Sequence, residues 1–251
     1  MKNLSQILHQ FESISLEKLL DADLMNRVDS KFLVNFSLLP KLLEELKDHY
    51  HVLEIENQRI SKYENFYFDS DDRRFYLDHH NHKNHRFKVR YRKYSSTKTT
   101  YFEIKERRKN RTIKQRFLVE QFVDDLGKKE MDLVQSVIGT KVKLYPVLVN
   151  EYHRITLAST ALKERLTIDV GVTYTKGEVK KPVGDVVIVE LKQEELNRMS
   201  PAFQVMNQNK IRPFRFSKYC VGSVLLFPKE EIKYNNFKYI IQKLNTYKNA
   251  I

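Results

Sequence analysis

The sequence between Arg86 and Phe117 reads RFKVRYRKY (86–94), SSTKTT (95–100), YFEIKERRKN (101–110) and RTIKQRF (111–117). Side chains alternate between the two faces of a β-strand, so residues two apart share a face. In the first segment, this places Lys88, Arg90 and Arg92 on one face and apolar side chains on the other. The alternation predicts a strand with one cationic face.

The two following segments repeat this pattern. In the second segment Glu103 and Lys105 share a face. In the third, which follows a turn at Lys109–Asn110, Lys114 and Arg116 share one. Neighbouring strands lie about 5 Å apart, so a meander brings these cations together. This concentration of like charge favours an anion-binding face, and a solvated sheet face is the alternative interpretation.

Composition points in the same direction. The chain has 251 residues, which fits one large domain, and a formal net charge of +13. A basic balance of this size is typical of proteins that bind nucleic acid, polyphosphate, nucleotides or an anionic membrane surface. The single cysteine, Cys220, excludes an internal disulfide and a cysteine-rich metal site, and it indicates a reducing compartment.

Targeting and membrane signals are not visible in the sequence. No apolar run has the length of a secretory signal or of a membrane span, which needs about 20 residues. We therefore expect a soluble, cytoplasmic protein.

The spacing of apolar residues predicts about eight strands with helices between them. Helical spacing occurs in 4–22, from Pro40 to Tyr50, in 121–139 and in 194–208, and 212–227 ends in an apolar helix or strand. Strand patterns occur at 25–33, 66–68, 86–94, 101–108, 111–117, 145–157, 165–174 and 186–192. Eight antiparallel strands can close into a small barrel that holds side chains or one ligand. With only six glycines, the chain has no glycine-rich phosphate loop.

A histidine-rich run, HHNHKNH, covers residues 79–85. It suggests a metal site formed by His79, His80, His82 and His85. Structural zinc sites usually draw their ligands from cysteines or from two separate elements. A mobile basic loop is therefore the favoured interpretation.

Eight segments in this order resemble the bacterial members of the VTC (vacuolar transporter chaperone) polyphosphate polymerase domain family. This family is part of the CYTH or triphosphate tunnel metalloenzyme superfamily. The segments are VDSKF (28–32), YFDSDDRRFYLDHHN (67–81), RFKVRYRKY (86–94), FEIKERRKNRTIKQRF (102–117), YPVLVNEYHR (145–154), LTIDVGV (166–172), VIVELK (187–192) and FRFSKYCVGSVLL (214–226).

The resemblance implies an α+β protein with an antiparallel eight-stranded β-barrel tunnel and helices packed around it. Residues 1–251 form a single tunnel domain in this interpretation. Residues 1–24 form an N-terminal helical segment, and residues 229–251 form a peripheral C-terminal tail.

The resemblance also implies which residues hold the substrate. The cations of the family's tunnel correspond to Lys31, Arg90, Arg92, Lys105, Lys114, Arg154 and Lys218. A second set of substrate-binding candidates comprises Lys88, Arg86, Arg116, Arg165 and Lys192. The metal-binding acid corresponds to Glu190, with Asp169 and Glu103 as further candidates. For these two, an ion pair with neighbouring cations is the alternative.

The sequence departs from the hydrolases of the superfamily at the first strand. Those enzymes carry a Glu-x-Glu-x-Lys pattern, whereas this chain has Arg27-Val28-Asp29-Ser30-Lys31. The departure favours a polyphosphate polymerase that transfers the terminal phosphoryl group of ATP to a polyphosphate chain. The alternatives are a triphosphatase acting on inorganic or nucleoside triphosphate and a non-catalytic module that binds polyphosphate or nucleic acid.

The implied cofactor is a divalent metal, Mn²⁺ or Mg²⁺, and the implied partners are ATP and inorganic polyphosphate. Nucleic acid is not expected, because an isolated acid such as Glu190 has no use in such a binder. The eukaryotic relatives sit in membrane complexes, so a membrane-protein partner supplied in trans would bring this chain to the inner face of a membrane.

Overall fold

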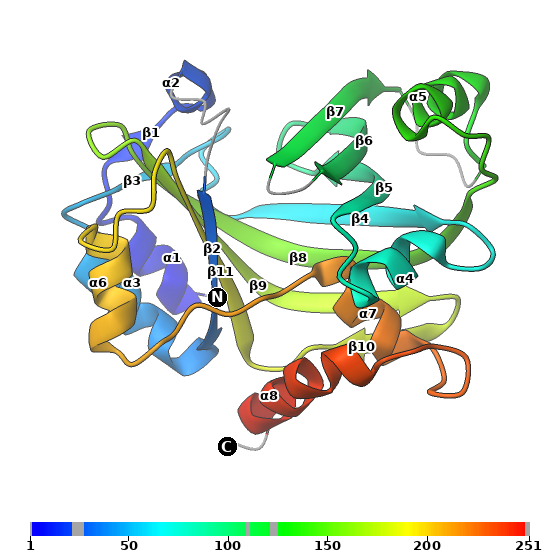
Figure 1. Cartoon of the computed structure of the whole chain (residues 1–251). Coiled ribbons are helices and arrows are strands. Elements are labelled where there is room, and N and C mark those ends of the chain that lie inside the picture. Colours follow the sequence, from blue (N-terminus) through cyan, green and yellow to red (C-terminus); the bar gives the residue numbers. More distant parts are fainter. Residues whose placement is uncertain (1, 22–27, 109–110, 121–124, 249–251) are drawn as a thin grey trace.

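A computed structural model describes residues 2–21, 28–108, 111–120 and 125–248. Eight strands, each antiparallel to its neighbours, form one curled sheet (Figure 1). Their spatial order is β2 (Val28–Asn35), β11 (Val186–Gln193), β9 (Glu164–Lys176), β8 (Tyr145–Ser159), β4 (Ser61–Asp69), β5 (His85–Tyr94), β6 (Thr99–Arg108) and β7 (Arg111–Val119).

Three short strands extend this sheet. The strand β1 (Ser13–Ile14) pairs in parallel with β3 (His51–Leu53), which pairs with β8. The strand β10 (Val179–Pro182) pairs with β9. The α+β class and the eight-stranded antiparallel sheet are as predicted.

The sheet is curled but open between its two outer strands. In the described part of the chain, β2 pairs only with β11, and β7 pairs only with β6. Closing this seam would bring cations of β2 and β7 closer together, which their like charge opposes.

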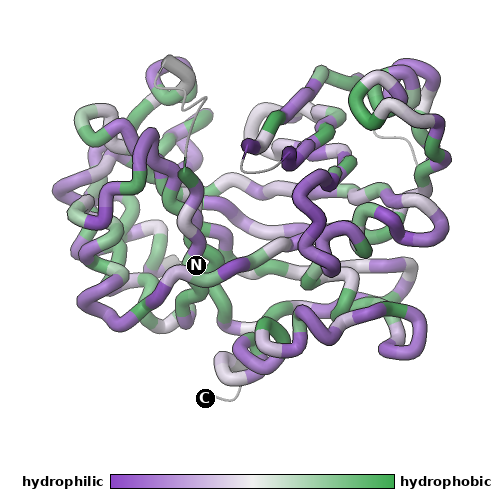
Figure 2. The backbone as a smooth tube through the Cα atoms, viewed as in Figure 1, coloured by the Kyte–Doolittle hydropathy of each residue, from purple (hydrophilic) through white to green (hydrophobic). Residues whose placement is uncertain are grey.

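The alternation predicted within residues 86–117 is confirmed by burial. Val89, Tyr91 and Phe102 are fully buried on the convex face of β5 and β6. Lys88 and Arg90 are only partly buried, because they point to the other face. Figure 2 shows hydrophobic and hydrophilic residues alternating along the strands, as two faces of opposite polarity require.

The helices divide into three groups. Their bounds are α1 (Lys2–Leu8), α2 (Leu16–Asp21), α3 (Leu39–Leu46), α4 (Arg74–His80), α5 (Lys128–Ile138), α6 (Pro201–Gln208), α7 (Lys218–Leu226) and α8 (Lys238–Lys248), with 3₁₀ turns η1 (Phe36–Leu38) and η2 (Asn235–Phe237). Helices α1, α3 and α6 pack on the convex face of β2, β11, β9 and β8. Helices α4 and α5 pack beside β5 and β6.

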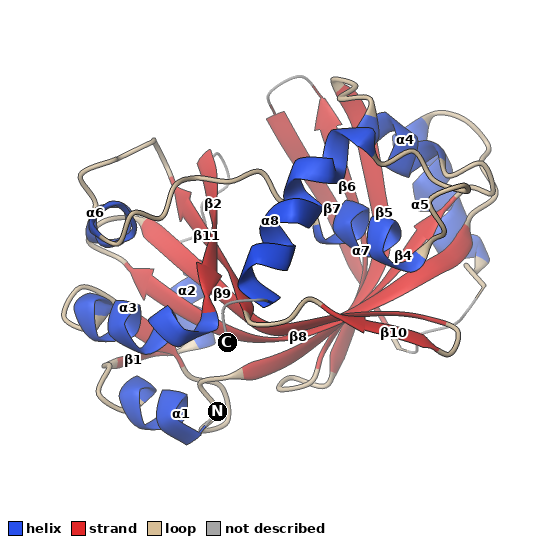
Figure 3. Cartoon of the chain, turned by 90° about the horizontal axis from the view of Figure 1, so that it is seen from below, coloured by secondary structure: helices blue, strands red, loops and turns tan. Residues whose placement is uncertain are grey.

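Helices α7 and α8 pack on the concave side of the sheet. Tyr219 and Ile240 form a buried cluster with Leu33 and Ile188, which share a strand face with Lys31 and Glu190 respectively. Figure 3 shows both helices between the two ends of the curled sheet. The C-terminal tail, expected at the periphery, therefore belongs to the core, because apolar residues of η2 and α8 are buried there.

Candidate functional site

The concave face carries a cationic cluster that extends over six strands and the first residue of α7. Its side chains share the face that points toward the interior of the curled sheet. They are Lys31, Lys88, Arg90, Arg92, Lys105, Lys114, Arg154, Lys192 and Lys218. Four carboxylates, Asp29, Glu103, Asp169 and Glu190, lie among these nine cations, so the face keeps a large positive excess.

Glu103 on β6 is surrounded by three of the cations. Its Oε2 accepts hydrogen bonds from Arg90 Nε at 2.9 Å and Nη2 at 2.7 Å, and its Oε1 lies 2.5 Å from Lys114 Nζ. Arg92 Nε is 3.8 Å away. Burial opposes ionisation of this carboxyl group, but the cations outweigh it and lower the Glu103 pKa. Glu103 therefore stays ionised and holds cations of β5 and β7 in place.

Asp169 on β9 makes a similar arrangement. Arg154 donates to both of its oxygens, at 2.6 Å and 2.8 Å, and Lys218 donates to Oδ2. Burial opposes ionisation here too, yet Arg154 and Lys218 outweigh it and lower the Asp169 pKa to about 2. This ion pair joins α7 to the sheet.

Glu190 on β11 lies between two lysines. Its carboxylate is 2.7 Å from Lys31 Nζ and 3.3 Å from Lys192 Nζ. Burial opposes ionisation, but Lys192, Lys31 and Lys105 together hold the Glu190 pKa well below its usual range. The side chain is 18% exposed, against 1% for Glu103 and 2% for Asp169, so Glu190 is the most accessible of the three.

Lys88 and Lys105 differ from the other cations. They are register partners on β5 and β6, and neither has an ion pair with a carboxylate in the part of the chain that the structure describes. Burial is the main cause that lowers both pKa values, that of Lys88 to about 7. Two neighbouring lysines without counter-ions are a ready site for a multivalent anion.

Helix α7 is fixed by contacts that position Lys218. Tyr219 donates from its hydroxyl to Asp69 at the end of β4. Asp69 is fully buried and also accepts from the backbone N–H of Phe75 and Tyr76, both at 2.9 Å, so it satisfies two donors in the first turn of α4. Gly222 lies so close to the Tyr174 ring that a Cβ would clash with it.

Two candidates of the second set, Arg86 and Arg116, lie at the margin of the cationic cluster. Arg86 donates from Nη1 to the Lys83 carbonyl at 2.5 Å, and its buried Nε has no partner among the described residues. Arg116 is exposed on β7, with its guanidinium 4.8 Å from the centroid of the Tyr101 ring.

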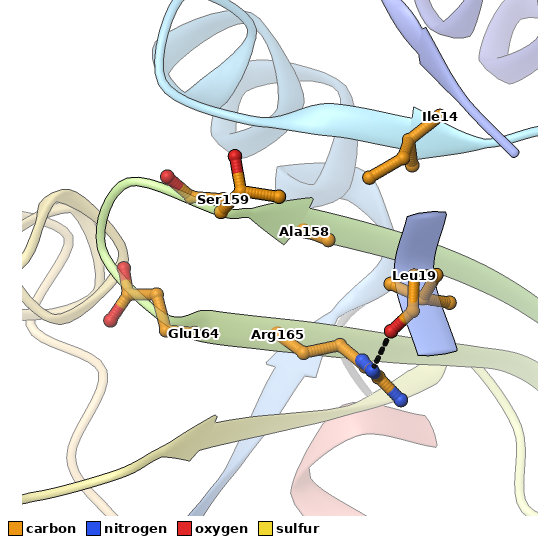
Figure 4. Close-up of a pocket in the computed structure, with 7 residues that line it drawn as sticks. Ile14, Leu19, Ala158, Ser159, Glu164 and Arg165 are labelled. Atoms are coloured by element: carbon orange, nitrogen blue, oxygen red, sulfur yellow. Dashed lines mark hydrogen bonds between the residues drawn. The ribbon is translucent and has the colours of Figure 1, made fainter. Parts of the chain in front are cut away.

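Arg165 is directed away from the cluster. Its Nη2 donates at 2.7 Å to the Leu19 carbonyl in α2, as Figure 4 shows. The pocket drawn there has a volume of about 10 Å³, which is no more than one water needs. Although Arg165 shares a strand face with Asp169, the structure gives it a contact with α2.

The histidine-rich run is divided among α4, the loop after it and β5, which begins at His85. His79 and His80 end α4, and His82 has a positive φ of 54° just after it. Burial is the main cause that lowers the His79 pKa, and nearby Lys88 adds to it. Within the described residues no group of three or more His, Cys, Asp or Glu side chains could hold a metal ion.

The three acidic candidates differ in how well they fit a divalent metal. Mg²⁺ is usually held by one or two carboxylates together with substrate phosphates and water. Glu190, the most accessible carboxylate, fits that mode of binding. Glu103 and Asp169 are almost fully buried, and their oxygens are occupied by Arg and Lys, so their surroundings fit ion pairs.

Sequence reasoning missed the contribution of β4 to this face. Asn65 Oδ1 accepts from Arg92 Nε at 2.9 Å, and Tyr67 Oη accepts from Arg90 Nη1 at 3.1 Å. The signal was the period-two pattern of residues 63–67, YENFY, which places Tyr63, Asn65 and Tyr67 on one face. Arg27, also expected on the polar face of the first strand, lies outside the described residues.

Comparison with known families gives a match over most of the chain. A family model described as VTC domain matches residues 26–227. Comparison with curated proteins gave no match. Among the helices that the structure describes, none is long and apolar enough to cross a membrane.

Solved structures share the fold at low sequence identity. One, from Bacillus halodurans and described as a candidate adenylate cyclase, is 13% identical with a TM-score of 0.52, covering 76% of this chain and 94% of its own. Another, from Hippeastrum, is described as a candidate adenylyl cyclase with a dominant triphosphatase activity. It is 13% identical with a TM-score of 0.53, covering 81% of this chain and 99% of its own.

Proposed function

This chain belongs to the VTC domain family, and from that premise we propose that it is a polyphosphate polymerase. The reaction would transfer the terminal phosphoryl group of ATP to a growing inorganic polyphosphate chain. Phosphoryl transfer depends mainly on positioning and on neutralising phosphate oxygens. A concave face with nine cations supplies both.

The observation that carries the proposal is the pair Lys88 and Lys105, neither of which forms an ion pair with a carboxylate among the described residues. These two lysines, together with the surplus of cations around them, make a site suited to a polyanion. An acceptor chain and a nucleoside triphosphate are both polyanions, so one continuous cationic face can hold the two reactants.

The distribution of carboxylates supports transfer to phosphate rather than to water. Glu103 and Asp169 are almost fully buried against cations of the cluster, whereas Glu190 and Asp29 are the partly exposed acids of this face. A divalent ion, Mn²⁺ or Mg²⁺, would neutralise and orient the reacting phosphate when bound. Glu190 would hold that ion together with phosphate oxygens, while Arg90, Arg92 and Arg154 bind the remaining oxygens.

A gel assay tests this proposal. Purified protein is incubated with ATP and Mn²⁺, and the product is separated on a gel stained for polyphosphate. We expect a ladder from the wild type and from Glu151→Gln, and none from Glu190→Gln. Glu151 is a matched control, because it is also paired with a lysine, Lys62 at 2.9 Å, but lies on the other face of β8.

The other outcomes separate the alternatives. Free phosphate without a ladder would assign the protein as a triphosphatase. Tight binding of polyphosphate without either product would leave a non-catalytic polyanion binder. Equal activity of Glu190→Gln and the wild type would remove Glu190 from the reaction.

A further inference from the structure

Four tyrosines form a row across the concave face, next to the cationic cluster. They come from four successive strands: Tyr152 on β8, Tyr63 on β4, Tyr94 on β5 and Tyr101 on β6. Tyr63 stacks on Tyr152 with ring centroids 5.5 Å apart, and it meets Tyr94 edge-on at 4.9 Å. Tyr94 meets Tyr101 edge-on at 5.8 Å.

The row changes from buried to accessible along its length. Tyr63 and Tyr152 are 8% and 2% exposed, whereas Tyr94 and Tyr101 are only half-buried. Beyond Tyr101 lies its register partner on β7, Leu118, which is 57% exposed. Directly opposite residues of antiparallel strands point to the same face. Tyr94, Tyr101 and Leu118 therefore form an accessible apolar shelf.

Arginines connect this shelf to the cluster. Arg92 lies 5.9 Å from the Tyr63 ring centroid and 6.0 Å from that of Tyr94, and Arg116 lies 4.8 Å from that of Tyr101. Tyr101 is two residues from Glu103 on β6, a separation of about 7 Å. Glu103 in turn holds Arg90 and Lys114, so the shelf is adjacent to phosphate-binding cations.

We propose that the shelf binds the base of a nucleoside triphosphate whose phosphates lie on the cationic cluster. The proposal rests on the proposed function and adds a contact that distinguishes the nucleotide from inorganic polyphosphate. Bases stack on aromatic rings and on arginine guanidinium planes, and Tyr101 with Arg116 offers both. Inorganic polyphosphate has no ring, so it gains nothing from the shelf.

Core packing explains Tyr63, Tyr152 and, in part, Tyr94, but not Tyr101 or Leu118. Tyr63 and Tyr152 are buried between the sheet and α7. Leu118 is exposed on the outermost strand, where a polar residue would serve packing equally well. Stacking is tolerant of base identity, so ATP and GTP are expected to bind within a few-fold of each other.

Calorimetric titration of ATP and of inorganic tripolyphosphate, without metal, tests the shelf. In Tyr101→Thr, which keeps a strand-forming residue, the Kd of ATP is expected to rise about tenfold or more, within the range for loss of one stacked base. The Kd of tripolyphosphate is expected to stay within about twofold, because stacking does not contribute to it. Leu118→Thr, at an exposed position, is expected to raise the Kd of ATP by a smaller factor and to leave the Kd of tripolyphosphate unchanged.

Tyr145→Thr is the matched control. Tyr145 is 38% exposed and has Lys143 Nζ 5.1 Å from its ring centroid, but it lies at the start of β8, opposite Asp69. Its substitution is expected to change neither Kd. Equal weakening of both ligands in Tyr101→Thr, or no weakening of either, would overturn the proposal.

The two proposals can fail separately. If no polyphosphate forms but Tyr101→Thr weakens ATP alone, the base subsite stands and the proposed reaction falls. If polyphosphate forms and Tyr101→Thr binds ATP like the wild type, the reaction stands and the subsite falls.

Discussion

Lys88 on β5 lies directly opposite Lys105 on β6, and within the described part of the chain neither lysine is paired with a carboxylate. Burial lowers both pKa values, which means that the folded protein holds these charges at a cost in free energy. The other cations of the cluster lie near Glu103, Asp169 or Glu190. Binding of an anion to Lys88 and Lys105 is therefore expected to change the stability of the fold.

Replacing Lys88 is expected to raise stability and lower affinity. Lys88→Met removes a partly buried charge that repels Lys105, so the free energy of unfolding at pH 6 should rise by about 1–2 kcal/mol. The Kd of tripolyphosphate should rise at least about tenfold. Chemical denaturation and calorimetry measure the two effects. Lys93→Met, on the other face of β5 and 51% exposed, should change neither. A less stable Lys88→Met with unchanged affinity would contradict this account.

Anion binding is expected to take up protons near neutral pH. The Lys88 pKa is about 7 and the Lys114 pKa about 8, mainly through burial, and bound phosphates would raise both. Tripolyphosphate binding at pH 8 should therefore take up roughly 0.5–1 proton. Calorimetry in buffers of different ionisation enthalpy measures this uptake, which Lys88→Met should reduce. A binding heat that is independent of the buffer would refute it.

The lowered Lys88 pKa also predicts how the stability of the ligand-free protein changes with pH. The unfolded chain keeps Lys88 protonated up to its ordinary pKa of about 10.4, whereas the folded chain loses the proton above about 7. The unfolded state then binds more protons over this range, so the free energy of unfolding should rise with pH. Denaturation between pH 6.5 and 9.5 should show a steeper rise for the wild type than for Lys88→Met. If the free energy of unfolding rises equally with pH in the wild type and in Lys88→Met, Lys88 is not the cause of the rise.

Removing the Glu103 carboxylate charge is expected to destabilise the fold strongly. Glu103→Gln leaves Arg90, Arg92 and Lys114 without their shared anion, a loss of about 3–5 kcal/mol. Because the folded pKa is lowered, this stabilisation is present above the unfolded pKa of about 4.3 and is lost as the pH falls.

Urea denaturation at pH 7 measures this effect. Its control is Glu64→Gln, which breaks a more exposed pair with Lys62 at 2.7 Å and should cost about 1 kcal/mol or less. Equal losses for both variants would show that Glu103 does not hold the cluster together.

Deleting one hydroxyl of α7 is expected to weaken anion binding from a distance. Tyr219→Phe removes the hydrogen bond from Tyr219 to the buried Asp69, at a cost of about 1–3 kcal/mol, and loosens the helix that begins with Lys218. We expect the Kd of tripolyphosphate to rise about threefold or more. Tyr247→Phe removes another hydroxyl, which donates to the Leu33 carbonyl at 3.1 Å, and should leave the Kd unchanged. An unchanged Kd in Tyr219→Phe would show that the docking of α7 does not affect anion binding at the cationic cluster.

The sequence alone determined the strands, their faces and the family. Alternation within 86–117 placed Lys88, Arg90 and Lys105 on the correct face, because the side-chain period of a strand is a local property of the backbone. The ordered segments identified the family, which the match over 26–227 confirms, and the eight-stranded antiparallel sheet that they implied is present in the structure.

Only the tertiary structure decided which charges meet. Lys218 reaches Asp169 because α7 packs inside the curled sheet, and Arg165 turns to Leu19 although its strand face matches that of Asp169. Sheet curvature and register also place three cations around Glu103. Among the described residues, they leave Lys88 and Lys105 without an ion pair to a carboxylate. These ion pairs depend on contacts between residues far apart in the sequence, and no local sequence pattern contains that information.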